Sequence, residues 1–143
     1  MKIKSNYPKA VDSKLVGNYD AIAKTGGGYV WDAVLEYRVW CHPDEGAEDL
    51  ENGNCYYYAF ETHEAALVFA TQHKGTEEPL ALVLQKEYID EPEPERYKHI
   101  KEQRITEWVP EFLQRPKRTK NTIIDFMSPN APTNKLDIIR GHI

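Results

Sequence analysis

The sequence has no long hydrophobic run and only two cysteines. No apolar stretch approaches the ~20 residues that a membrane-spanning helix needs. The first nine residues, Met-Lys-Ile-Lys-Ser-Asn-Tyr-Pro-Lys, have no apolar segment typical of a secretion signal. These absences predict a soluble, cytoplasmic protein that does not bind membranes. Without an oxidising compartment, Cys41 and Cys55 are expected to be free thiols, and the lack of a Cys-x-x-Cys pair predicts no structural metal site.

The chain also lacks a large excess of one charge, since its net charge is −5, but its charges are unevenly distributed. Residues 1–29 carry +3, residues 30–95 carry −13 and residues 96–143 carry +5. Either the basic ends pack over the acidic middle and neutralise it, or they form a surface for nucleic acid or an acidic partner. Because the total is negative, the first interpretation is preferred and nucleic acid is not expected as a partner.

The 143 residues are typical of one domain. Alternation of apolar residues predicts strands over 34–41 and 55–60. A helix over 63–74 is expected to begin after Thr62, whose hydroxyl can cap a backbone N–H, and to end at Gly75. The apolar run 80–85 predicts a central strand. The sequence therefore predicts a single α+β domain, with an antiparallel-rich sheet and one main helix, about 63–74, on one face.

The flanking segments are predicted less regularly. Residues 1–29 are expected to form a helical extension, with a helix over 8–24, and a glycine hinge; residues 30–114 form the α+β core. The Glu-Pro-Glu-Pro-Glu segment at 91–95 predicts a solvated loop, because proline cannot donate a ladder hydrogen bond. Further strands are expected within 97–109 and a short helix over 110–114. Residues 115–143 are expected to form a basic, extended C-terminal tail.

The catalytic patterns in the sequence fail on their context. The glycines 26–28 are expected between a helix and a strand, the reverse of a phosphate-binding loop. Cys41 directly precedes His42, and because adjacent strand residues point to opposite faces, the two side chains do not pair while both remain in the strand. The leading hypothesis is therefore a non-catalytic ligand- or partner-binding accessory protein. No cofactor is strongly implied, and the partner is an unknown small anionic ligand or a protein.

Five segments resemble a family of short bacterial proteins of uncharacterised function, over about residues 30–141. The family is often labelled as a GNAT-type N-acetyltransferase, which implies acetyl-CoA as a cofactor. The nearest match to the pyrophosphate-binding loop of such enzymes is Gln-His-Lys-Gly-Thr-Glu at 72–77. The segments that carry the resemblance are Trp31–Cys41, Glu78–Gln85, Glu87–Pro94, Ile105–Trp108 and Asn134–Gly141.

A second, weaker resemblance is to ADP-ribosyltransferase-like, NAD-dependent domains, through a strand with a basic residue, an aromatic strand leading into a helix, and a late glutamate. It implies that Arg38 holds a phosphate, Tyr58 packs on the nicotinamide and Glu107 stabilises the transition state as the catalytic candidate.

Arg38, Tyr58, Glu107 and Trp108 are accordingly the candidate residues of a ligand-binding cleft. Arg38 is the only lysine or arginine between Lys24 and Lys74. A lone arginine inside a strand either binds an anionic ligand or pairs with a carboxylate of the fold. The structural alternative is an ion pair of Arg38 with Glu107 or Glu36, and the sequence leaves both interpretations open.

Overall fold

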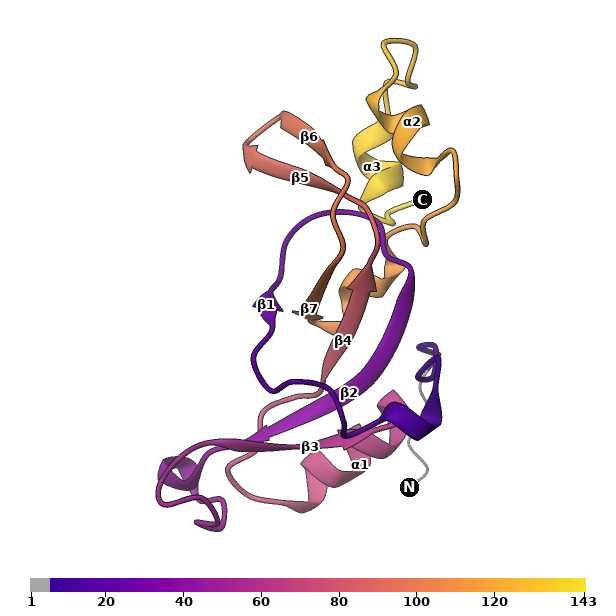
Figure 1. Cartoon of the computed structure of the whole chain (residues 1–143). Helices are drawn as coiled ribbons and strands as arrows, with labels where there is room; N and C mark the ends of the chain where they lie inside the picture. The colour runs from indigo at the N-terminus through magenta and orange to yellow at the C-terminus, as the bar shows by residue number, and fades with distance from the viewer. Residues whose placement is uncertain (1–5) are drawn as a thin grey trace. The chain divides into compact units, whose positions relative to one another are not determined.

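The computed structural model describes residues 6–143 and shows a single-domain α+β protein in which two compact units can be distinguished (Figure 1). Unit 1 comprises the described residues up to Ala21 together with Val34–Leu82. Unit 2 comprises Ile22–Ala33 and Val83–Ile143. The expected α+β class is confirmed, and the sheet is mixed, because it contains parallel as well as antiparallel pairs.

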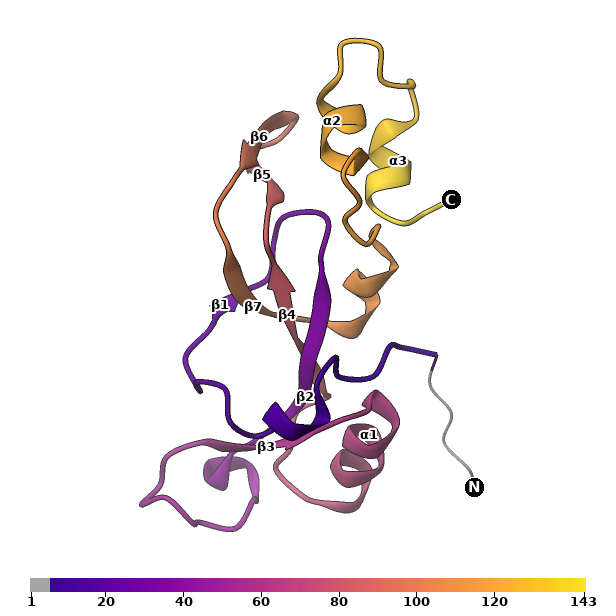
Figure 2. The same ribbon diagram turned by 45° about the vertical axis from the view of Figure 1, so that its right-hand side comes forward.

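Unit 1 is built on two antiparallel strands, β2 (Ala33–Cys41) and β3 (Tyr56–Phe60). In the register of this pair, Cys41 lies opposite Tyr56 and Tyr37 lies opposite Phe60. Helix α1 (His63–Gln72) begins after Thr62, whose hydroxyl accepts from the N–H of Ala65 as the sequence predicts. The helix runs beside β3 (Figure 2).

The helix α1 covers one face of the β2–β3 pair through aromatic contacts. The Phe69 ring lies 5.0 Å from that of Tyr58 and 5.4 Å from that of Phe60. The first half of β4 (Leu80–Gln85) adds buried residues to this unit, and the strand continues into unit 2. The predicted strands and main helix of this region are confirmed to within two residues.

The N-terminal segment of unit 1 differs from the expected helix over 8–24. It contains only a 3-10 helix, η1 (Ser13–Leu15), and strand β1 (Lys24–Thr25) of unit 2 then follows. Three apolar residues that lie near helical spacing in this segment face solvent, because Val11, Leu15 and Ile22 are 66%, 45% and 93% exposed. Gly17 adopts φ +88°, which no helix accommodates. Residues 1–5 of the expected extension lie outside the described residues.

Unit 2 contains a parallel pair and a hairpin. Strand β1 pairs in parallel with β7 (Arg104–Trp108), and β5 (Tyr88–Glu93) pairs antiparallel with β6 (Arg96–Ile100). The expected solvated loop over 91–95 is wrong, because 91–93 complete β5 and the chain turns at Pro94 and Glu95. The ladder tolerates Pro92 because the pairing register shifts between Asp90 and Glu93.

The C-terminal part of unit 2 is folded rather than extended. The predicted short helix is present as the 3-10 helix η3 (Pro110–Gln114), and two further helices follow, α2 (Thr122–Met127) and α3 (Lys135–Ile139). They lie next to each other (Figure 1). Ile123, Phe126 and Ile139 bury their side chains in a cluster with Tyr29, Val30 and Ile89. This apolar packing replaces the extended tail that the polar composition suggested. Within residues 6–143, no helix has the length and apolar character to cross a membrane.

Candidate functional site

Arg38, the centre of the cleft predicted from sequence, is fully buried in unit 1. Its Nε donates to Glu36 Oε2 at 2.7 Å, and the carboxylate of Glu36 is itself fully buried. The guanidinium also donates to the carbonyls of Asp20 and Ala21 and lies 4.4 Å from the ring centre of Tyr57. The structural alternative, an Arg38–Glu36 ion pair, is therefore present.

The other three candidates lie in different surroundings. Tyr58 in β3 is 43% exposed and borders a cavity of unit 1. Glu107 lies in β7, beside Thr25 of β1. Trp108 is fully buried in unit 2 and donates from Nε1 to the carbonyl of Gly27 at 3.2 Å. Neither of the cavities described below is lined by Arg38, Glu107 or Trp108, and their assignment to a ligand site stays a prediction.

The glycines 26–28 present carbonyl oxygens to cationic and N–H groups of unit 2. Gly27 O accepts from Arg104 Nη2 at 3.0 Å, and Gly28 O accepts from Arg115 Nη1. An anion-binding loop would instead turn its N–H groups toward the ligand. A strand, β1, precedes these glycines rather than the expected helix, but the carbonyl orientation supports the sequence conclusion that they do not cradle phosphate.

Two basic residues that the sequence assigned to a solvated tail support the fold of unit 2. The guanidinium of Arg115 lies 3.7 Å from the ring centre of Phe112 and 4.8 Å from that of Tyr29, and burial lowers its pKa. Arg118 is paired with Asp32 at 2.8 Å and with Glu87 at 3.1 Å. These two positive charges are engaged within the protein.

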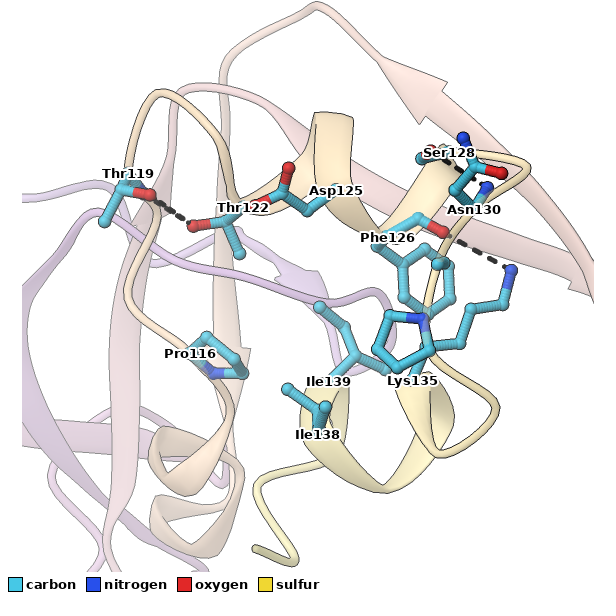
Figure 3. A pocket seen from close by; sticks show the side chains of 12 residues that line it. Pro116, Thr119, Thr122, Asp125, Phe126, Ser128, Asn130, Lys135, Ile138 and Ile139 are labelled. Atoms are coloured by element: carbon cyan, nitrogen blue, oxygen red, sulfur yellow. Dashed lines mark hydrogen bonds between the residues drawn. The ribbon is translucent and has the colours of Figure 1, made fainter.

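The larger cavity of the two lies in unit 2 between α2 and α3 and measures about 500 Å³ (Figure 3). Phe126, Ile138 and Ile139 form an apolar wall, and Lys135 lies beside Phe126. The Lys135 ammonium donates to the Phe126 carbonyl at 3.3 Å and lies 4.7 Å from its ring centre. Figure 3 shows Thr119 and Thr122 on the opposite side from Lys135, joined by a hydrogen bond between their hydroxyls. The lining thus combines apolar walls with a cation, Lys135, and a carboxylate, Asp125.

A smaller cavity of about 180 Å³ lies in unit 1 on the α1 side of β2 and β3. Cys41, Tyr58, Phe69 and His73 are among its lining residues. The Cys41 thiol is buried, and this burial raises its pKa, so the thiol is held in its protonated form.

Three side chains with catalytic chemistry meet at the ends of the unit 1 strands. His42 Nδ1 lies 2.8 Å from the thiol sulfur of Cys55, and His42 Nε2 lies 3.0 Å from Glu77 Oε1. The second contact is an ion-pair contact rather than an aligned hydrogen bond, because the carboxylate lies off the direction of the ring N–H. The three residues follow β2, precede β3 and precede β4 respectively.

Sequence reasoning missed this group because it tested His42 only against its neighbour Cys41. The pairing of Cys41 with Tyr56 places the next residue of one strand, His42, opposite the preceding residue of the other, Cys55. Pairing the two aromatic strands as a hairpin in this register predicts that His42 and Cys55 are neighbours. Within residues 6–143, no group of three or more His, Cys, Asp or Glu side chains is arranged to hold a metal ion.

Comparison with known proteins finds no family model, no curated protein and no solved structure that matches the chain.

Proposed function

We propose that the protein is a non-catalytic binding domain for a small organic anion, and that the ligand occupies the cavity between α2 and α3. The observation that carries this proposal is the cavity of about 500 Å³ with an apolar wall and a lysine. Ligand sites in proteins typically measure about 300–1,000 Å³ and combine mostly apolar walls with a few polar groups. The cavity has both properties.

The lining residues indicate the chemistry of the ligand. Phe126, Ile138 and Ile139 suit an aliphatic or aromatic body. Lys135 has three N–H donors, of which one points to the Phe126 carbonyl, so that others can reach a carboxylate or phosphate of the ligand. The hydroxyls of Thr119 and Thr122 on the opposite side can hydrogen-bond to a polar group at the far end. A small amphipathic carboxylate fits these features.

The test is ligand-observed NMR with a library of aromatic and aliphatic carboxylic acids, each paired with its uncharged primary amide. We expect the acids to bind about ten-fold more tightly than the amides, the difference that one charge-assisted hydrogen bond provides. Lys135→Met should remove this difference, whereas Lys101→Met, an exposed lysine of the same unit, should preserve it.

Equal binding of acids and amides to the unmodified protein, or an unchanged preference in Lys135→Met, would contradict the assignment. Acetyl-CoA and NAD belong in the same screen, because the two resemblances imply them as cofactors. Turnover of either compound would overturn the proposal that the domain only binds its ligand.

A further inference from the structure

Cys55, His42 and Glu77 form a row across the ends of three strand segments of unit 1, far in sequence from the cavity proposed above. The Cys55 residue is exposed, and its sulfur lies 2.8 Å from His42 Nδ1. The backbone at His42 is held by hydrogen bonds, since its N–H donates to Gly75 O at 2.7 Å and its carbonyl accepts from Ala47 N. The imidazole is therefore held beside an accessible thiol.

The two ring nitrogens of His42 have different neighbours. In the neutral tautomer with its proton on Nε2, that proton lies near the Glu77 carboxylate, whose Oε1 is 3.0 Å away, and Nδ1 can accept the thiol proton. Once Nδ1 is protonated, the Glu77 carboxylate stabilises the imidazolium. Glu77 is thus a positioning residue, and His42 is the base that contacts the reacting sulfur.

The second cysteine provides an internal comparison. Cys41 is 2% exposed, and its sulfur lies 3.7 Å from the Val39 carbonyl. Cys41 and Cys55 differ in burial and in their nearest polar neighbour. Thiol reactivity requires both access and a means of forming the thiolate, and only Cys55 combines them in the described part of the chain.

We propose that Cys55 is a reactive thiol that forms mixed disulfides with small, positively charged disulfides. His42 Nδ1 takes the Cys55 proton, and the thiolate electron pair attacks one sulfur of R–S–S–R. The new Cys55–S–S–R bond forms as the S–S bond of the reagent breaks. The leaving R–S⁻ departs with the bonding pair and takes the proton from the imidazolium, so that no further oxidant is required.

The preference for a cationic disulfide follows from the charges that surround the thiol. The loop between His42 and Cys55 carries five carboxylates and no lysine or arginine, and Glu77 adds a carboxylate 3.0 Å from His42 Nε2. Lys74, which lies shortly after the end of α1, packs beside Gly46 of this loop. The net negative field attracts cations and repels anions. The loop carboxylates are Asp44, Glu45, Glu48, Asp49 and Glu51.

The first experiment measures the rate of mixed-disulfide formation with cystamine, a dicationic disulfide, by intact-mass spectrometry between pH 6 and 9.5. Carboxylates stay ionised over this range, and both proteins meet the same form of the reagent at each pH, so the ratio of their rates reports on imidazole and thiol. At pH 6.5 we expect His42→Asn to react about ten-fold more slowly than the unmodified protein, because a free cysteine is then only about 1% thiolate. The difference should vanish near pH 9.5, where thiols ionise without a base.

Matched variants separate reactivity from folding. Cys41→Ser should leave the rate unchanged, and Cys55→Ser should abolish the adduct. Glu77→Gln, at a side chain that is 51% exposed, should slow the reaction a few-fold at pH 6.5 without loss of the folded circular-dichroism signal. If His42→Asn fails to fold, Glu77→Gln still tests the proposal. Equal rates of the unmodified protein and Glu77→Gln or His42→Asn over the whole range, or an adduct on Cys41, would overturn it.

The second experiment compares cystamine with the anionic oxidised glutathione and the neutral 2-hydroxyethyl disulfide. Cystamine is expected to react at least about ten-fold faster than oxidised glutathione in 10 mM salt, and the ratio should fall in 0.5 M salt as the charges are screened. The neutral reagent should fall between them. A faster reaction with oxidised glutathione, or a ratio near one in low salt, would overturn the assignment of a cationic substrate.

Discussion

Each unit of the protein holds an arginine away from solvent, and the two units satisfy its charge differently. In unit 1, the fully buried Arg38 is paired with the buried carboxylate of Glu36 and donates to two backbone carbonyls. In unit 2, the half-buried Arg115 lies against the rings of Phe112 and Tyr29 and donates to the Gly28 carbonyl. Both guanidinium groups lie against aromatic rings, but the complete burial of Arg38 is accompanied by a carboxylate partner as well.

This difference follows from the energy of removing a charge from water. Complete desolvation costs several kcal/mol per ion, which an opposite charge at hydrogen-bond distance can offset. A partly solvated guanidinium keeps some hydration, so ring faces and a carbonyl suffice. Glu36 also accepts from Gly17 N at 2.8 Å, so the Arg38 pair links β2 to the N-terminal segment of unit 1. We therefore expect the two arginines to contribute unequally to stability.

The largest effect is expected for Arg38→Ala. This change leaves the Glu36 carboxylate buried without its guanidinium partner, and should reduce the free energy of unfolding by about 3–5 kcal/mol. Urea denaturation followed by circular dichroism measures the loss. The paired replacement Arg38→Met with Glu36→Leu should cost less than Arg38→Ala alone, since it removes both charges. A change below about 1 kcal/mol in Arg38→Ala would show that the pair is not structural and would favour a ligand role for Arg38.

A smaller loss is expected for Arg115→Met. Methionine keeps an apolar stem against Phe112 but removes the cation–ring contact and the hydrogen bond to Gly28 O, for a loss of about 2 kcal/mol in the same urea measurement. Lys120→Met is the control at a nearby exposed cation and should change stability by less than about 0.5 kcal/mol. If Arg115→Met costs as much as Arg38→Ala, the proposed distinction between the two arginines fails.

The same contrast explains how far the sequence could predict the structure. In unit 1 the strands and α1 were predictable because their signals are local: alternation along β2 and β3, and the N-cap at Thr62. The choice between a binding and a structural role for Arg38 was not local. It depends on Glu36, which shares its strand, and on carbonyls at Asp20 and Ala21, which arrive from an irregular segment. The sequence therefore left both interpretations open.

In unit 2 the local signals were weaker and partly misleading. Helices as short as α2 and α3 draw their stability from tertiary packing rather than from intrinsic propensity. Their apolar pairs, Ile123 with Phe126 and Leu136 with Ile139, have helical spacing but stand in a polar, proline-containing segment. The cavity between these helices could not be anticipated once the segment was taken as extended. The Cys55–His42 contact, in contrast, could be anticipated from the pairing register of β2 and β3.

The smallest expected effect on stability appears at high pH and concerns the Tyr37 hydroxyl, an uncharged hydrogen-bond donor that is buried in unit 1. Tyr37 is fully buried next to Arg38 in sequence, and its hydroxyl donates to the Pro8 carbonyl. Burial, with a smaller contribution from Tyr7, raises its pKa above the ordinary value of a tyrosine. In unit 2, the Tyr29 hydroxyl instead donates to the Glu91 carboxylate at 2.8 Å. That bond and, more strongly, the backbone N–H of Glu95 lower the pKa of Glu91.

A raised pKa in the folded state means that Tyr37 contributes its full stability below the unfolded value of about 10 and loses it as the pH rises above that value. Tyr37→Phe removes this titration together with the hydrogen bond to Pro8. The stability advantage of the unmodified protein over Tyr37→Phe should therefore shrink by about 0.8 kcal/mol between pH 9 and pH 10.5, as tyrosine in the unfolded chain ionises while folded Tyr37 stays protonated. Urea denaturation of both proteins at the two pH values measures the shift. An advantage that stays constant would mean that Tyr37 ionises equally in the folded and unfolded states, and a growing advantage would reverse the sign expected from its burial.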